Sequence, residues 1–321
     1  MTAVPLLSRV ANSVYWASRY IERAENVARY IDVNLQLMLD AAGTHEQWKP
    51  LIDTSGDAAA FHERYGEASR ENVIRFLTVD PENPNSILSC LRSARENART
   101  VRDTISSEMW EQANKLHLVI QEELTRNRAE TAPFELFYDL RMGCHLFEGI
   151  TDGTMSHNEA YRFARLGRLI ERADKTTRIL DVKYFLLLPR LEDVGSSRDD
   201  VQWAAVLKSV SGFEMYRKRH GRIKPSRIAE FLLLDRDFPR SVRFCLSRAD
   251  RALHAITGSP EGSGNTPAER RLGHLRAELD YASVDEIIAN GLHEFLDSMQ
   301  SKLNEIDDAV FDTFFALRPL D

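Results

Sequence analysis

The stretch from Tyr15 to Val33 returns 149 positions further along the chain, and this internal repeat limits the possible folds more than any other sequence feature. Two copies of one segment predict two copies of one structural unit. The identical residues are Arg19, Ile21, Glu22, Arg23, Ala24, Arg29, Asp32 and Val33, which return as Arg168, Ile170, Glu171, Arg172, Ala173, Arg178, Asp181 and Val182. Glu25 returns as Asp174.

The repeated segment has the periodicity of an amphipathic helix. Its apolar residues recur at heptad-like spacing, and neither Pro nor Gly interrupts the stretch. At about 100° per residue, a second face carries charged and amide side chains, namely Glu22, Asn26 and Arg29 with Arg19 and Glu25 beside them. One side of the helix is therefore expected in the core, and the function of the other side depends on what it faces.

A second part of the chain repeats at a spacing of 155. The recurring residues are Trp48, Phe76, Leu77, Asp80, Pro84, Ser86, Cys90, Leu91 and Ala94, which return as Trp203, Phe231, Leu232, Asp235, Pro239, Ser241, Cys245, Leu246 and Ala249. No long stretch alternates apolar and polar residues as strands do. The sequence predicts an all-α helical bundle built from an internal duplication. The two repeats would span residues 1–156 and 157–321, either as two domains or as one compact two-repeat domain.

Helix-breaking Pro and Gly residues and N-cap residues set the expected ends of the helices. Long helices are expected at 11–41, at 86–124 with a bend near Ser106, at 134–150, at 157–188 and at 283–315. A shorter helix is expected at 69–79, residues 44–68 show little pattern, and residues 151–154 should break the chain. Capping boxes are predicted at Ser156–Glu159, Thr266–Glu269 and Ser283–Glu286.

Composition excludes several classes of function. The net charge is −7, and such an acidic chain argues against nonspecific nucleic-acid binding, which needs a basic surface. No apolar stretch is long enough to span a membrane. The three cysteines, Cys90, Cys144 and Cys245, are too few and too widely spaced for a disulfide framework or a zinc module, and are expected to be reduced and buried. The chain is expected to be cytoplasmic.

Three segments resemble the alpha-E family of bacterial proteins. They are Leu7–Trp16 running into Arg19–Asn26, Ala94–Trp110 with its Ala-Arg-Glu-Asn-Ala-Arg sequence, and Gly167–Asp174. The resemblance implies an all-helical protein whose gene commonly lies beside genes for a circularly permuted ATP-grasp ligase and a transglutaminase-like protein or other peptidase. It therefore implies a peptide-forming or peptide-modifying pathway, but no established reaction.

The charged faces form three ladders. The first is Arg19, Glu22, Arg23, Glu25, Asn26 and Arg29, and the second is Arg168, Glu171, Arg172, Asp174, Lys175 and Arg178. The third is Arg92, Arg95, Glu96, Asn97, Arg99, Arg102 and Asp103. Each is compatible with a buried ion-pair network that docks the repeats, with a polar cleft that binds carboxylate or phosphate groups, or with a solvated face. The recurrence indicates a role without choosing between packing and chemistry.

The leading hypothesis is a helical component of an ATP-grasp-associated peptide ligation or modification system. Its ladders would bind a carboxylate-bearing peptide, an amino acid, or the partner ligase or transglutaminase-like protein. One alternative is an enzyme with Glu22, Glu171 or Glu96 as general base and arginines as anion stabilisers. Another is a structural adaptor, and a homo-oligomer is left open.

The sequence predicts neither a metal nor another cofactor. Glu135, Asp139, His145, Glu148 and His157 lie near one another in sequence, but His145 and Glu148 have the reverse of the Glu-x-x-His order of di-iron bundles. Cys90 and Cys245 have no histidine at a helical neighbour position, and no Gly-rich phosphate loop occurs.

Overall fold

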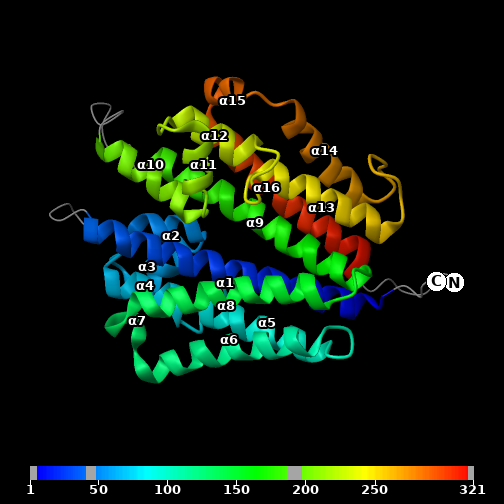
Figure 1. Ribbon diagram of the computed structural model, residues 1–321, viewed down its shortest axis with the longest axis horizontal. Coiled ribbons are helices and arrows are strands. Elements are labelled where there is room, and N and C mark those ends of the chain that lie inside the picture. Colours follow the sequence, from blue (N-terminus) through cyan, green and yellow to red (C-terminus); the bar gives the residue numbers. More distant parts are fainter. Residues whose placement is uncertain (1–5, 41–47, 187–196, 317–321) are drawn as a thin grey trace.

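A computed structural model describes residues 6–40, 48–186 and 197–316 of the chain (Figure 1). These residues form sixteen α-helices and one π-helical segment, and no strand occurs within the three ranges. The all-α prediction is therefore confirmed. None of the described helices is long and apolar enough to cross a membrane.

The first half of the chain forms a four-helix bundle. Its helices are α1 (Ser8–Asp40), α5 (Ile87–Thr100), α6 (Ser107–Arg126) and α8 (Pro133–Thr154). The apolar stripe predicted for α1 enters this core, where it packs against the inner faces of the other three helices. Fully buried members of the core are Val14, Ala28, Ile31, Ile87, Leu91, Ile120, Leu136 and Phe137.

The second half forms a bundle with the same order of contacts. Its helices are α9 (Glu159–Leu186), α13 (Val242–Thr257), α14 (Pro267–Tyr281) and α16 (Leu292–Val310), followed by the π-helical segment Phe311–Phe315. In both bundles the first helix contacts the second and the last, and the third closes the ring. Each bundle therefore has its own core, and Figure 1 shows the two lying one above the other.

Short helices cover the ends of the bundles. They are α2 (Lys49–Ser55), α3 (Ala58–Tyr65), α4 (Arg70–Thr78), α7 (Arg128–Thr131), α10 (Ser197–Ser209), α11 (Phe213–His220), α12 (Pro225–Leu234) and α15 (Val284–Asn290). Two of them reach across to the other bundle, since α2 packs against α9 and α10 packs against α1. Both central helices thus carry contacts from both halves.

Helices α1 and α9 pack directly against each other and join the two bundles. Gly167 of α9 makes the close approach possible, because a Cβ atom there would lie 2.5 Å from the backbone oxygen of Tyr15. Tyr15 of α1 is buried in the core of the second bundle, and Tyr161 of α9 in that of the first. The cores are therefore interlocked, while the predicted boundary between residues 156 and 157 stays a prediction.

Matching local features occur at equivalent places in the two halves. Ser86 caps α5 by accepting a hydrogen bond from the backbone N–H of Ser89, and Ser241 caps α13 by accepting one from Phe244. Both Gly66 and Gly221 end a short helix with positive φ, at +70° and +72°. The six residues by which the repeat spacing grows were expected after the second long helix, in a segment whose residues 187–196 lie outside the described part of the chain.

Several predicted helix ends are wrong. The helix expected at 86–124 is two helices, because the chain turns at residues 101–106 and Ser106 caps a new one. Residues 151–154 belong to α8 rather than to a break. The helix expected at 283–315 is interrupted at Gly291, which has φ +104°, and α2 and α3 lie where little pattern was expected.

The three predicted capping boxes have different outcomes. The box at Thr266 and Glu269 is confirmed. At α9, the side chain of Asn158 accepts the backbone hydrogen bond from Tyr161, and Glu159 instead accepts one from the N–H of Leu6, so the box at Ser156 is wrong. The side chain of Ser283 makes no cap hydrogen bond at α15. The three cysteines are free and buried, as predicted.

Candidate functional site

The two repeated Glu-Arg pairs bind each other across the contact between α1 and α9. Glu22 of α1 accepts hydrogen bonds from Arg172 of α9, at 2.9 Å from Nε and 2.7 Å from Nη2. Glu171 of α9 accepts the reciprocal pair from Arg23 of α1, at 2.7 Å from Nε and 2.9 Å from Nη2. We call these four residues the Glu–Arg clamp. Each carboxylate is held at two points by the arginine of the other repeat, which is the geometry of a strong guanidinium–carboxylate pair.

Further cations surround each carboxylate of the clamp. Arg19 donates to Glu171 from Nε at 3.1 Å, and it also pairs with Asp307 of α16. Arg240, directly before the cap of α13, donates to Glu22 at 3.0 Å and to Glu25 at 3.0 Å. The turn before α13 and helix α16 of the second bundle are therefore tied to α1.

The clamp is buried and its carboxylates are ionised. Glu22 is 4% exposed and Glu171 is fully buried. Burial alone would raise the pKa of Glu22, but the guanidinium groups of Arg172 and Arg240 hold it well below its ordinary value. Burial would also raise the pKa of Glu171, but the nearby cations Arg23, Lys175 and Arg19 hold it well below its ordinary value. A general base needs a pKa near the working pH, so neither carboxylate has the property expected of one.

Arg29 lies deeper on the same face of α1. Its side chain is fully buried and forms an ion pair with Glu25, yet none of its guanidinium nitrogens makes a hydrogen bond to a described residue. Burial and then the neighbouring Arg240 lower its pKa well below the ordinary value. Cations are therefore crowded around Glu22 and Glu25, and the first ladder is an internal network rather than a solvated face.

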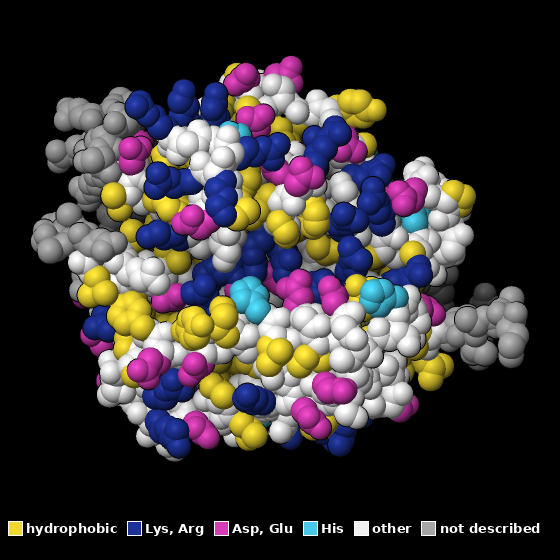
Figure 2. All heavy atoms as spheres, viewed as in Figure 1, with side chains coloured by type: hydrophobic (Ala, Val, Ile, Leu, Met, Phe, Trp, Pro, Cys, Tyr) yellow, Lys and Arg dark blue, Asp and Glu magenta, His cyan; other side chains and the backbone are white. Residues whose placement is uncertain are grey.

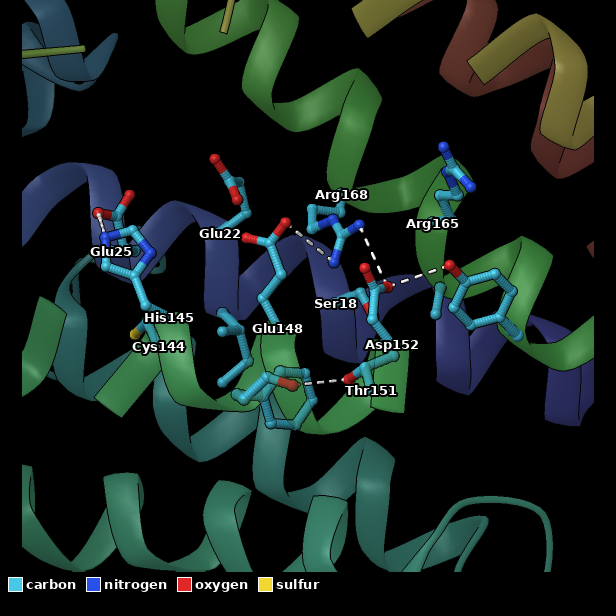
Figure 3. A pocket seen from close by; sticks show the side chains of 14 residues that line it. Ser18, Glu22, Glu25, Cys144, His145, Glu148, Thr151, Asp152, Arg165 and Arg168 are labelled. Atoms are coloured by element: carbon cyan, nitrogen blue, oxygen red, sulfur yellow. Dashed lines mark hydrogen bonds and ion pairs between the residues drawn. The ribbon is translucent and has the colours of Figure 1, made fainter. Parts of the chain in front are cut away.

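A hollow on one face of the molecule opens onto this network. Figure 2 shows Lys, Arg, Asp and Glu side chains gathered in it between the two halves. In Figure 3, Arg168 points toward Glu148 and Asp152 of α8, and His145 lies beside Glu25. Arg168 Nη1 is 3.3 Å from Glu148, and Arg172 donates to the same carboxylate at 2.9 Å. The enclosed space is only about 10 Å³, enough for about one water molecule.

His145 is neutral in this setting. It lies 3.5 Å from Glu25, but burial, with Arg29 and Arg240 nearby, lowers its pKa to about 4. His145 and Glu148 were considered as metal ligands from the sequence. Within the described part of the chain, no group of three or more His, Cys, Asp or Glu side chains is arranged to hold a metal ion.

A larger pocket of about 220 Å³ opens on the other side of the clamp. Its lining includes cationic, acidic and amide side chains from α1, α9 and α16, from the turn after α2 and from the turn before α5, namely Arg19, Arg23, Asp57, Asn85, Asp174, Lys175, Arg178 and Asn304. We call it the Lys175 pocket. It therefore collects five residues of the predicted ladders, Arg19, Arg23, Asp174, Lys175 and Arg178, around a space large enough for a small ligand.

Ion pairs hold the walls of the Lys175 pocket in place. Arg178 donates to Asp174 from Nε at 2.9 Å, and Lys175 Nζ lies 3.2 Å from the same carboxylate. Elsewhere in the lining, Asn85 accepts a hydrogen bond from Arg23 at 2.6 Å and donates to Asp57 at 3.0 Å. Burial would raise the pKa of Asp174, but Lys175 and Arg178 keep it below its ordinary value.

Gly56 brings the end of α2 close to this pocket. It ends the helix with φ +83°, in the left-handed region that glycine adopts without strain. A Cβ atom at this position would lie 3.3 Å from Nη1 of Arg178. Glycine therefore serves both the turn that ends α2 and the close approach of the Arg178 guanidinium.

The third predicted ladder lies apart from the clamp. Glu96 on α5 pairs with Arg95 and, at 2.8 Å, with Arg99, and its side chain is 44% exposed. The hydrogen bond from Arg99 is the main reason that the pKa of Glu96 is lowered. Arg95 and Arg102 lie over the ring of Trp110 of α6, and Asn97 bonds to the backbone of its own helix. This ladder matches the solvated-face interpretation.

Sequence reasoning missed several members of the network. Asn85 and Arg240 were not singled out, although each directly precedes the serine that caps the next helix of its repeat. Their shared position at the 155-residue spacing was the available signal. Tyr15 donates to Asp307 at 2.6 Å, a contact between residues 292 positions apart that no local pattern indicates.

Comparison with known proteins identifies a family for nearly the whole chain. The sequence model of the Alpha-E family, described as a predicted alpha-helical domain with a conserved ER motif, matches residues 6–315. Uncharacterized proteins of Mycobacterium bovis and Mycobacterium tuberculosis are 24% identical to the chain over 336 aligned positions. The alignment covers 96% of this chain but only 37% of the length of each relative. No solved structure matches the chain.

Proposed function

The chain belongs to the Alpha-E family, and we propose that it is the helical component of an ATP-grasp-associated peptide ligation or modification system. In this proposal the Glu–Arg clamp joins the two bundles, and the Lys175 pocket binds the free carboxylate end of a peptide or an amino acid. The observation that carries the proposal is the gathering of Lys175, Arg178, Asp57 and Asp174 around one open pocket.

The chemistry of the pocket suits a ligand that carries both charges. Among the described residues, the contacts of Arg178 with Asp174 use only Nε, which leaves both Nη groups for a planar two-point contact with a carboxylate. Lys175 offers a second cation beside it, since its Nζ is 3.2 Å from Asp174. Asp57 also lines the pocket, where its oxygens can accept hydrogen bonds from a ligand ammonium group as they do from Asn85.

The size of the pocket favours a small group. Its volume of about 220 Å³ is below the range of about 300–1,000 Å³ that is typical of pockets for drug-sized ligands. An amino acid or the terminal residue of a peptide is therefore a better match than a large cofactor. The Glu–Arg clamp is not available to such a ligand, because its charged groups already bind one another.

The proposal includes an origin by internal duplication, with repeats at 1–156 and 157–321. Two features support it: the shared ring of helix contacts in the two bundles, and the exchange of arginines between Glu22 and Glu171. In a duplicated dimer-like arrangement, each unit would offer the same Glu-Arg pair to the other.

Calorimetric titration tests the ligand. We expect saturable binding of a glutamyl dipeptide with a free terminal carboxylate, and at least about tenfold weaker binding of the same dipeptide amidated at that end. Arg178→Gln should weaken binding of the free acid, because one guanidinium fork is lost. Arg99→Gln removes the same charge from a half-exposed position on α5 and should leave binding unchanged. Equal affinity for the free and the amidated dipeptide would overturn the ligand proposal. An affinity for the free acid that Arg178→Gln leaves unchanged would overturn it too.

A pull-down from the native cell tests the partner separately. The tagged chain should recover an ATP-grasp ligase or a transglutaminase-like protein. Recovery of neither protein would contradict the partner part of the proposal while leaving the titration result intact. Arg178→Gln in the same experiment shows whether the partner needs the Lys175 pocket.

A further inference from the structure

A basic groove lies on the second bundle, away from the Glu–Arg clamp. Five arginines line it, namely Arg236, Arg243, Arg248, Arg251 and Arg276, and we call it the arginine groove. They come from the turn before α13, from α13 itself and from α14. On the face shown in Figure 2, Lys and Arg side chains gather over α13. The groove has a volume of about 470 Å³, within the range of about 300–1,000 Å³ for small-molecule sites.

The charge of the groove contrasts with that of the chain. Its lining holds five arginines and a single acidic residue, Asp280, whereas the whole chain carries a net charge of −7. Among the described residues, Arg243, Arg251 and Arg276 each face a carboxylate while Arg236 and Arg248 face none, so the groove keeps more positive than negative charge. An excess of positive charge in one concave place therefore favours a bound anion.

Two of the arginines in the groove are held in place by ion pairs with neighbouring carboxylates. Arg243 donates to Asp280 at 2.9 Å, and Arg276 Nη1 lies 3.1 Å from the buried carboxylate of Asp250. Arg276 is the nearest cation to Asp250 among the described residues, and His254 Nε2 lies 3.5 Å from the other carboxylate oxygen. These ion pairs fix the direction of both guanidinium groups before any ligand arrives.

The other arginines are free to contact a ligand. Within the described ranges, Arg236 and Arg248 have no carboxylate partner, and Arg248 lies 5.2 Å over the ring of Phe244. Arg251 faces Glu261 only at 3.7 Å, and both side chains are more than half exposed. The groove therefore combines a fixed pair of guanidinium groups with three that can close onto an anion.

We propose that the arginine groove binds a phosphate-bearing ligand that carries more than one negative charge. Planar guanidinium forks match the oxygens of a phosphate group, and several forks favour a diphosphate or triphosphate over a single carboxylate. Tyr281, at the end of the groove, is 89% exposed and offers a ring on which a base can stack. The phosphate chain can thus belong to an inorganic polyphosphate or to a nucleoside phosphate.

Titration of the full chain with pyrophosphate and with ADP tests the proposal. Both ligands should bind saturably. The double variant Arg236→Gln/Arg248→Gln should weaken both by about tenfold or more, because two charge-assisted contacts are lost. The matched control is Arg126→Gln/Arg271→Gln, which removes the same charge at exposed positions on α6 and on the other side of α14, and it should bind as the wild type does. Arg236→Gln alone, at an exposed turn, gives a smaller loss and needs no test of folding beyond circular dichroism.

The outcomes distinguish the sources of the phosphate. Tighter binding of ADP than of pyrophosphate, with the difference removed by Tyr281→Ala, would support a nucleoside phosphate. Equal binding of both would support a polyphosphate chain alone. The proposal is overturned if neither ligand saturates, if the control variant is weakened as much as the groove variant, or if a short RNA binds more tightly than either ligand.

Discussion

Replacing Gly167 with alanine tests the contact between α1 and α9. A Cβ atom at this position would lie 2.5 Å from the backbone oxygen of Tyr15, 3.0 Å from its ring and 3.1 Å from Cγ of Arg19. Backbone atoms cannot rotate away, so α9 must shift from α1. That shift would also lengthen the hydrogen bonds of the Glu–Arg clamp, which spans the same contact.

The expected magnitude follows from two opposing effects. Alanine in place of a helical glycine stabilises by about 0.5–1 kcal/mol, and overpacking a tight contact costs about 1–3 kcal/mol. Gly149 on α8 is the matched control, because it is exposed and a Cβ atom there would meet nothing within 4 Å. Gly149→Ala should therefore stabilise the protein, and Gly167→Ala should be less stable than this control by about 1–3 kcal/mol, the overpacking cost alone.

Urea unfolding followed by circular dichroism measures both free energies of unfolding. The reasoning requires the two chemically identical substitutions to differ by about 1–3 kcal/mol in their effect on the free energy of unfolding. If Gly167→Ala and Gly149→Ala change the free energy of unfolding equally, the close approach of α9 to Tyr15 is refuted.

Three further predictions concern titratable groups. Burial raises the pKa of the Cys90 and Cys245 thiols to about 12, so a thiol reagent should modify them in urea and not in the folded protein; rapid modification without urea would contradict their burial. The ring of His145 should titrate in NMR spectra near 4, because of burial and the nearby Arg29, and a value near 6.5 would contradict its placement. The pKa values of Glu22 and Glu171 are lowered in the folded state, so their contribution to stability is complete above about 4.3, the ordinary carboxyl value, and is lost as the pH falls below it. Unfolding curves across this range should show that loss in the wild type and less of it in Glu171→Gln.

The sequence predicted the elements that build the Glu–Arg clamp. Repetition at the 149-residue spacing identified Glu22, Arg23, Glu171 and Arg172, and the apolar stripe of α1 predicted which face enters the core. The sequence also left open whether the ladders are a docking network, a cleft or a solvated face. The first two ladders form a buried network with a pocket beside it, and the third is largely solvated.

The exchange of partners between the repeats could not be predicted. It depends on how closely α1 and α9 approach, and only the three-dimensional contact at Gly167 sets that distance. Nor did periodicity reveal the interruption at Gly291, because the apolar pattern continues from α15 into α16 on either side of it. Helix breaks that preserve the buried face leave little trace in the sequence.

The contacts that other helices make with α1 were the hardest to predict from the sequence. Arg240 binds Glu22 and Glu25 because the turn before α13 reaches α1, over a separation of 218 positions for Glu22. Asp307 reaches Arg19 from the last helix. Such contacts follow from the packing of whole bundles rather than from any local signal.

A double-mutant cycle between Arg23 and Glu171 measures the clamp most directly. Glu171→Gln alone should cost about 3–5 kcal/mol, because Arg23 and Arg19 would remain buried without their shared carboxylate. Combined with Arg23→Gln, the loss should be smaller than the sum of the single losses by about 1–3 kcal/mol. That coupling would establish the bond between the repeats as a stabilising interaction. Losses that add to within about 0.5 kcal/mol would contradict the account, since independent sites behave in that way.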